Sequence, residues 1–208
     1  MTEDLLRDDP VQLVVTESSR VFDGLVWGVR RESFELAGQS ITREFLDHTG
    51  AVAVLALDEW GRALLIKQYR HPARVREWEL PAGLLDTAGE SPLAAAQREL
   101  AEEADVAAAN WSVLSDFMTS PGGSNEAVRV YLARGISATS AIFTRTEEEA
   151  EIVTRWVPLD DIVQAVLARR VQNSILVVAA LTAAASLARG WRSLGDADAP
   201  WPRHPAAG

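Results

Sequence analysis

Three glutamates within five consecutive residues are the clearest candidates for chemistry in this sequence of 208 residues. Glu99, Glu102 and Glu103 would lie on one side of a helix, because residues three and four apart are neighbours on its surface. Like charges at these spacings destabilise a helix by about 0.2–0.5 kcal/mol per pair. A hard divalent cation reverses that balance, since Mg²⁺ takes carboxylate oxygens and leaves room for water and substrate phosphate. The cluster therefore indicates phosphoryl chemistry at a metal, with a solvated helix face that holds an Arg98–Glu102 ion pair as the alternative.

A helix that carries these glutamates is predicted to begin at Ser91 and Pro92 and to run to about Ala104. Serine is a favoured N-cap residue, and proline is favoured at the first helical position. The segment before the helix, residues 78–83 with the sequence WELPAG, leads into a glycine-containing loop. This helix start therefore places the three glutamates in the second half of the predicted helix.

Residues 83–106 resemble the Nudix box, whose pattern is Gly, five residues, Glu, seven residues, Arg-Glu, an aliphatic, any residue, Glu-Glu, any residue, Gly, an aliphatic. The sequence departs from this pattern twice. Six residues separate Gly83 from Glu90, which leaves the role of Glu90 open, and Asp105 replaces the late Gly. That Gly ends the helix in a left-handed conformation, which Asp tolerates better than most residues. Neither departure changes the three glutamates.

Outside the box, the sequence resembles the ADP-ribose pyrophosphatases of the Nudix family over roughly residues 20–185. Pro121 lies fifteen residues after Val106, where this subfamily has a marker proline. The segments 42–44, 68–70, 78–83 and 120–124 are also similar to it. The resemblance implies metal-dependent hydrolysis of the pyrophosphate bond of ADP-ribose to AMP and ribose 5-phosphate, with Mg²⁺ or Mn²⁺ as cofactor.

The resemblance also implies the metal ligands and the catalytic residues. Glu99, Glu102 and Glu103 would hold the ions together with the backbone carbonyl of Ala82. Glu102 and a general base would carry the catalysis. The base is expected in an acidic loop just before a strand, with Glu148 preferred among four candidates: Glu147, Glu148, Glu149 and Glu151.

Substrate contacts are implied at six positions: Arg43, Glu44, Arg70, Leu84, Ser124 and Glu126. Arg43 and Arg70 would contact phosphate or sugar, because the planar guanidinium fork suits phosphate, and Glu44 would reach the adenine end. Without the resemblance, Arg43, Glu44 and Arg70 would be interpreted as ordinary charged surface residues of strands. Trp27 or Trp78 would stack on the adenine or simply pack, and the three histidines are interpreted as structural or solvent-facing.

The composition excludes several classes of function. Twenty Lys and Arg against 30 Asp and Glu give a net charge of −10 at pH 7, which argues against nucleic acid because that partner requires a basic face. The absence of cysteine excludes disulfides, thiolate zinc sites and a cysteine nucleophile. The acidic first ten residues predict no signal peptide, and the uncharged run 175–188 is shorter than the about 20 residues of a membrane span. A cytoplasmic protein without membrane contact is expected.

Strand-like runs dominate the chain, with one helix in the middle and two at the end. Apolar patterning predicts strands over residues 11–15, 22–29, 41–46, 51–57, 63–69, 111–118, 127–133 and 152–157, and closing helices over 159–170 and 173–189. This order favours an α+β fold, and the resemblance makes it a Nudix-like α/β/α sandwich with a mixed central sheet. The expected organisation is an N-terminal antiparallel strand region exchanged in a homodimer (1–48), a Nudix hydrolase domain (49–192) and a flexible tail (193–208).

Two other functions stay open from the sequence. The box serves the pyrophosphate and not the group attached to it, so another nucleoside diphosphate sugar or a dinucleotide would fit equally. A non-catalytic ADP-ribose sensor would need the same fold without turnover. The number of metal ions, the identity of the base and the phosphorus that is attacked are not set by the sequence.

Overall fold

The computed structural model describes residues 6–139, 143 and 151–204. These divide into two compact units. The first comprises residues 1–48 and 122–125, and the second comprises residues 49–121 and 126–208.

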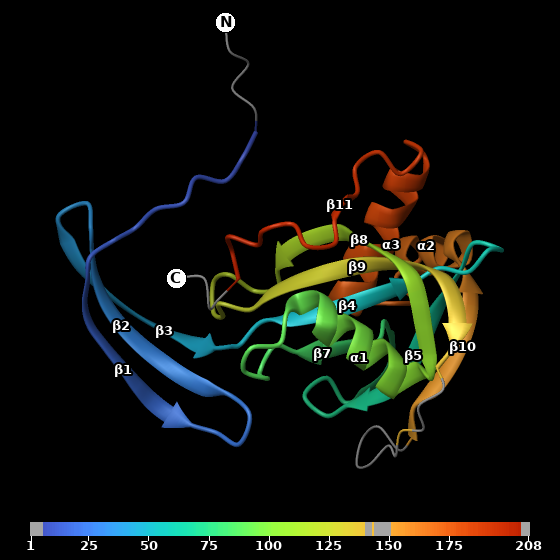
Figure 1. Ribbon diagram of the computed structural model, residues 1–208. Helices are drawn as coiled ribbons and strands as arrows, with labels where there is room; N and C mark the ends of the chain where they lie inside the picture. The colour runs from blue at the N-terminus through green and yellow to red at the C-terminus, as the bar shows by residue number, and fades with distance from the viewer. Residues whose placement is uncertain (1–5, 140–142, 144–150, 205–208) are drawn as a thin grey trace, which may run out of the picture. The chain divides into compact units, whose positions relative to one another are not determined.

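The first unit contains a three-stranded antiparallel sheet in the order β1-β2-β3 (Figure 1). The strands are β1 (Val15–Asp23), β2 (Gly28–Leu36) and β3 (Gln39–Asp47). The predicted strand over 22–29 is wrong at its centre, because residues 24–27 form the turn between β1 and β2. The N–H of Gly24 donates to the Trp27 carbonyl at 2.9 Å, and a Cβ at position 24 would come within 2.6 Å of that oxygen. The turn therefore requires glycine, a local signal that the apolar run concealed.

The second unit is built on a five-stranded mixed sheet in the order β11-β8-β9-β4-β7. Strands β4 and β9 are parallel, and the other neighbours are antiparallel. A smaller antiparallel sheet has the order β10-β5-β6. The strands of this unit are β4 (Ala51–Ala56), β5 (Arg62–Arg70), β6 (Val75–Glu79), β7 (Ala82–Leu84), β8 (Val106–Met118), β9 (Ala127–Ala138), β10 (Val153–Pro158) and β11 (Gly195–Asp196).

Helices cover both faces of the mixed sheet: α1 (Pro92–Ala104) on one, α2 (Leu159–Leu167) and α3 (Ser174–Leu187) on the other (Figure 1). Alternate residues of β4 enter two separate cores. Val54 packs in the core that contains Leu100 of α1, and Leu55 in the core that contains Leu176 of α3. The period of two along a strand explains this division. The predicted α/β/α sandwich with a mixed central sheet is confirmed.

The predicted boundaries of α1 are confirmed at both ends. Ser91 caps its start by accepting a hydrogen bond from the Ala94 N–H at 3.2 Å, and Pro92 occupies the first turn. Asp105 ends the helix in the left-handed conformation, with φ 55° and ψ 34°. Aspartate thus replaces the glycine that the Nudix pattern places there.

Several elements differ from the predicted ones. Strands β6 and β7 are absent from the predicted strands. Their patterns are weak, because β6 carries mostly charged residues and β7 has three residues. Helices α2 and α3 are shorter than predicted, the latter because Asn173 caps it. In the described part of the chain, no helix combines the length and apolar character of a membrane span.

The segment that was expected to form a tail makes defined contacts within the described residues, which end at His204. Strand β11 pairs with β8, with Gly195 opposite Val113 and Asp196 opposite Ser112. Trp201 is 9% exposed. Because burial of a large aromatic side chain is stabilising, Trp201 anchors this segment.

Candidate active site

Arg98 lies at the centre of a cluster of carboxylates on α1 and the loop before it. Its guanidinium donates to both oxygens of Glu90, at 2.9 and 3.0 Å, in a two-pronged contact. Its Nη1 also donates to Glu99 at 2.7 Å and to Glu102 at 3.0 Å. Hydrogen bonds to Glu90, followed by those to Glu99 and Glu102, raise the pKa of Arg98. One cation therefore holds three carboxylates in fixed positions.

This arrangement gives Glu90 the role that the sequence left open. The hydrogen bonds from Arg98 lower the pKa of Glu90 below its ordinary value, so the carboxylate is ionised at neutral pH. The extra residue in the loop therefore does not prevent Glu90 from reaching Arg98. Glu90 is a partner of the arginine in this structure.

Glu103 lies on the part of α1 that faces β7. It is 5% exposed, and its Oε2 accepts a hydrogen bond from the backbone N–H of Ala82 at 2.9 Å. A buried carboxylate requires such a partner, and here the partner belongs to the residue whose carbonyl was predicted as a metal ligand. The contact connects the helix to the sheet at the predicted site.

Gly83 is needed because Glu99 occupies the space beside it. A Cβ built on Gly83 would overlap the carboxylate of Glu99. The first glycine of the box thus has a steric reason that sequence reasoning did not give. Glu99 and Glu103 reach the backbone of adjacent residues in β7, although 16 and 21 positions separate each pair in the sequence.

The residues fit a hard divalent cation by the chemistry of their donors. Glu99, Glu102 and Glu103 with the Ala82 carbonyl supply only oxygen, the ligand type that Mg²⁺ and Mn²⁺ prefer. Within the described ranges, no three acidic or histidine side chains enclose a common metal position. In this structure Arg98 contacts Glu99 and Glu102, and the Ala82 N–H contacts Glu103. Gly83, the residue after the predicted carbonyl ligand Ala82, leaves the space that the Glu99 carboxylate occupies.

Three of the predicted substrate residues lie in the second unit. Arg70, at the end of β5, donates to both oxygens of the buried Glu79 at 2.8 and 2.7 Å. Leu84 is the last residue of β7, directly after Gly83. Glu126 accepts a hydrogen bond from the Thr119 hydroxyl at 2.5 Å. The assignment of these residues to the substrate stays a prediction.

The other three belong to the first unit. Glu44 on β3 forms an ion pair with Arg31 on β2, and Arg43 donates to the Thr42 carbonyl at 2.8 Å. The hydroxyl of Ser124 donates to the Leu46 carbonyl at 3.4 Å. The structure thus gives each a local partner, and their contacts with substrate also stay predictions.

The candidates for the general base fall mostly outside the described residues. Glu147, Glu148 and Glu149 lie there, so their assignment stays a prediction. Glu151 forms an ion pair with Arg76 of β6.

Each of the three histidines contacts an aromatic side chain. The buried His48 stacks on Trp27 with ring centroids 4.2 Å apart, so Trp27 packs within the first unit. His71 contacts the Tyr69 hydroxyl at 3.2 Å, and His204 lies edge-on to Trp201. These contacts agree with the structural interpretation of the histidines.

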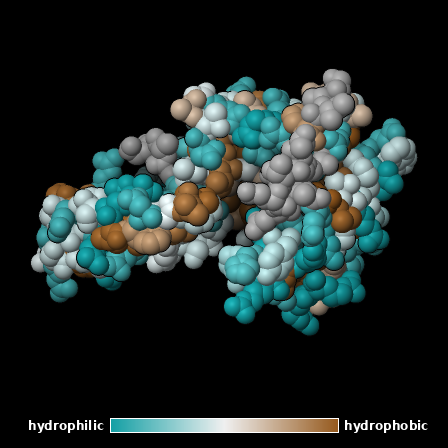
Figure 2. Space-filling model, turned by 90° about the horizontal axis from the view of Figure 1, so that it is seen from below, coloured by the Kyte–Doolittle hydropathy of each residue, from teal (hydrophilic) through white to brown (hydrophobic). Residues whose placement is uncertain are grey.

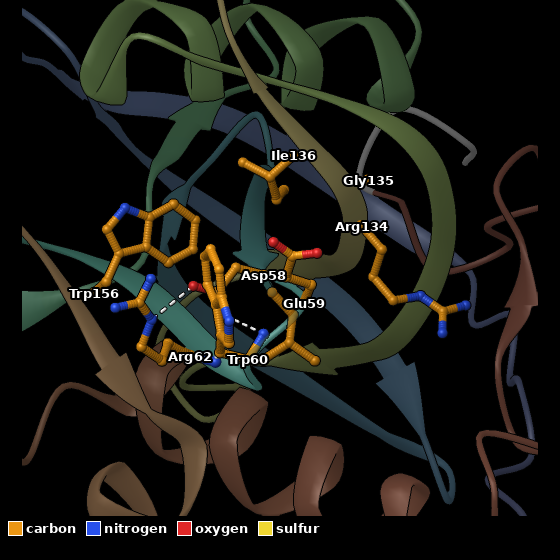
Figure 3. Close-up of a pocket in the computed structure, with 9 residues that line it drawn as sticks. Asp58, Glu59, Trp60, Arg62, Arg134, Gly135, Ile136 and Trp156 are labelled. Carbon is orange, nitrogen blue, oxygen red and sulfur yellow. Dashed lines mark hydrogen bonds and ion pairs between the residues drawn. The ribbon is translucent and has the colours of Figure 1, made fainter.

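A pocket of about 480 Å³ at the β4–β5 turn is lined by none of the glutamates of α1 (Figure 3). Its Asp58 carboxylate accepts hydrogen bonds from the N–H groups of Trp60 and Arg62 and from Arg62 Nε, at 3.0, 2.8 and 2.7 Å. Burial raises the pKa of Asp58, but these hydrogen bonds outweigh it and lower the pKa below its ordinary value. Asp58 therefore stabilises the turn between β4 and β5 and is not a candidate for the box chemistry.

Comparison with known proteins shows the class. A family model described as the NUDIX domain matches residues 47–179. The chain therefore belongs to the Nudix family and is a Nudix hydrolase.

Several relatives are named ADP-ribose pyrophosphatase. One, from Mycobacterium tuberculosis (strain ATCC 25618 / H37Rv), is 39% identical over 191 residues and covers 91% of each chain. Another, from Bacillus subtilis (strain 168), is 36% identical over 156 residues, which are 74% of this chain and 83% of the relative. A crystal structure of an ADP compounds hydrolase matches the fold with a TM-score of 0.72 at 20% identity, covering 89% of this chain and all of the other. Within its family, the chain is thus similar to ADP-ribose pyrophosphatases.

Proposed function

We propose that this Nudix hydrolase cleaves the pyrophosphate bond of ADP-ribose to AMP and ribose 5-phosphate with a divalent metal ion. The observation that carries the proposal is the group of carboxylates on α1, two of which meet the backbone of residues 82–83. The 39% identity to an ADP-ribose pyrophosphatase over most of the chain supports the substrate. A cytoplasmic location, expected from the sequence, goes with this proposal.

The residues that would hold Mg²⁺ are Glu99, Glu102 and Glu103 with the Ala82 carbonyl. When bound, the ion supplies positive charge that neutralises the pyrophosphate oxygens and acidifies a water. Arg98 orients Glu99 and Glu102 through its hydrogen bonds. Because α1 is capped at both ends, these carboxylates would need little reorganisation to hold the ion, and the ion would in turn neutralise the substrate's negative charge.

Proton removal from the attacking water is assigned to the acidic residues 147–151, with Glu148 preferred and Glu102 as the second catalytic candidate. The substrate would be held by Arg43, Glu44, Arg70, Leu84, Ser124 and Glu126. Arg70 already forms a bidentate contact with Glu79, the geometry with which a guanidinium also binds phosphate.

A substrate panel tests the proposal. With saturating Mg²⁺, we expect AMP and ribose 5-phosphate from ADP-ribose, at a kcat/KM above that for ADP-glucose, GDP-mannose and NADH. Preference for one of the other three compounds would support a hydrolase that acts on a substrate other than ADP-ribose. Binding of ADP-ribose without turnover in Mg²⁺ or Mn²⁺ would instead support the ligand sensor.

Dimerisation through the first unit is part of the proposal. The end of β1 and the turn after it expose large apolar side chains, Phe22 at 61% and Val26 at 63%, and hydrophobic residues interrupt the polar surface of this unit in Figure 2. Such side chains mark protein interfaces when they gather, and a second copy would bury them. Sedimentation velocity at micromolar concentration should show a dimer, and Val26→Asp should shift it toward the monomer. A wild-type monomer would contradict the dimer.

A further inference from the structure

The last described segment of the chain, residues 195–204, crosses the α1 side of the central sheet. It begins at β11, which pairs with β8 at the edge of that sheet (Figure 1). Ala199 packs against the core that lies between the sheet and α1. The segment is therefore part of the layer that contains the candidate active site.

Arg129 on β9 anchors this segment. It is 3% exposed and forms a two-pronged contact with Asp116 of β8, 2.8 Å at each oxygen. The same guanidinium donates to the carbonyls of Ala199 and Pro200 at 2.7 and 3.2 Å. It also lies 4.8 Å from the ring centroid of Trp201, within cation–π range. Burial alone lowers the pKa of Arg129, but Asp116 raises it above its ordinary value, so the anchor stays charged.

From this anchor the segment reaches the loop that leads into α1. Trp201 and His204 line one side of a pocket of about 420 Å³, and residues 85–90 with Pro92 line the other. This loop contains the additional residue relative to the Nudix pattern, and Glu90 at its end holds Arg98. Residues 86–89 are exposed, so the loop has little packing of its own.

We propose that residues 195–204 position the loop 85–90 and, through it, Glu90. Trp201 and His204 of this segment face the lengthened, exposed loop and limit its movement. Arg129 holds the segment against the sheet. Glu90 in turn holds Arg98, which orients Glu99 and Glu102. Trp201 is thus a positioning residue that acts on the carboxylates without contacting them. The link to metal binding and catalysis rests on the proposed function.

The experiment compares Trp201→Ala with Trp60→Ala, a matched substitution at a tryptophan that is 70% exposed on the β4–β5 turn. Hydrogen exchange without metal or substrate should be at least about tenfold faster in Trp201→Ala at the amides of Leu85 and Glu90, which donate to the carbonyls of Gly50 and Thr87. The same amides should not change in Trp60→Ala. Titration with MgCl₂ alone, followed by calorimetry, should show Mg²⁺ affinity lowered about 10- to 100-fold, the usual effect of losing support behind metal ligands.

Two further variants separate positioning from folding. Trp201→Phe keeps an aromatic ring beside Arg129 and should restore most of the protection, whereas His204→Ala removes only the second of the two side chains that face the loop and should give a smaller increase in exchange. Unchanged exchange at Leu85 and Glu90 in both Trp201→Ala and His204→Ala would overturn the proposal. Faster exchange in a protein that does not hydrolyse ADP-ribose would leave the positioning role intact and refute the proposed function alone.

Discussion

Replacing Glu103 by Gln is expected to lower kcat/KM for ADP-ribose about 100- to 1,000-fold, because Gln cannot supply a charged ligand to the metal. This range corresponds to a loss of roughly 3–4 kcal/mol of transition-state stabilisation, within what a metal ion contributes. The fold should persist, since the Gln carbonyl can still accept the hydrogen bond that the Ala82 N–H donates to Glu103. Steady-state kinetics over a range of Mg²⁺ concentrations, with thermal unfolding in parallel, measures both effects.

Glu59→Gln is the matched control for this substitution. Glu59 is exposed and lines the pocket at the β4–β5 turn, so its loss of charge should leave kcat/KM within about twofold. Full activity in Glu103→Gln would remove Glu103 from the metal site. A large loss in Glu59→Gln would indicate that the active site lies in the turn pocket instead.

Gly83→Ala tests the same site without changing any charge. Its new methyl group would displace the Glu99 carboxylate and should therefore lower activity.

Replacing Arg98 by Met should weaken both the fold and the active site. Arg98 forms ion pairs with Glu90, Glu99 and Glu102, and its removal leaves like charges close together. Hydrogen bonds to charged groups are worth about 1.5–3 kcal/mol each when buried. Since Arg98 is 32% exposed, we expect a total loss of about 2 kcal/mol, or roughly 4–8 °C in the unfolding midpoint at this chain length. Activity should fall about 10- to 100-fold, as when ligands lose their supporting partners.

Thermal unfolding without metal and kinetics with Mg²⁺ measure the two effects of this substitution. Arg98→Lys is the control, because it keeps the charge but loses the fork that contacts both oxygens of Glu90. Its unfolding midpoint and activity should lie between those of the wild type and Arg98→Met. An unchanged midpoint and unchanged activity in Arg98→Met would show that these pairs contribute nothing, as is true of many exposed ion pairs.

Local patterns predicted those parts of the fold whose signals lie within a few residues. Ser91 and Pro92 marked the start of α1, and the end of α1 at Asp105 follows from the same local chemistry. The turn at residues 24–27 was missed because an apolar run extended across Gly24. Strands β6 and β7 were missed because short or charged strands take their stability from neighbouring strands rather than from their own composition.

The roles of residues in the site were predicted less completely than their identities. Helix periodicity alone placed Glu99, Glu102 and Glu103 on one side. It did not predict that Gly83 makes room for Glu99, or that Glu90 and Arg98 form a pair despite the lengthened loop. Each of these contacts joins residues from different elements.

The sequence by itself determined the family and the helix that carries the carboxylates, and it predicted the type of ion, because those inferences depend on residue types at fixed local spacings. The tertiary structure decided which partners hold the carboxylates, and it also placed the C-terminal segment on Arg129. Glu103 meets Ala82 across 21 positions, and Arg129 meets Ala199 across 70. Contacts at such separations depend on which strands and helices pack against one another, and local residue spacing does not specify those pairings.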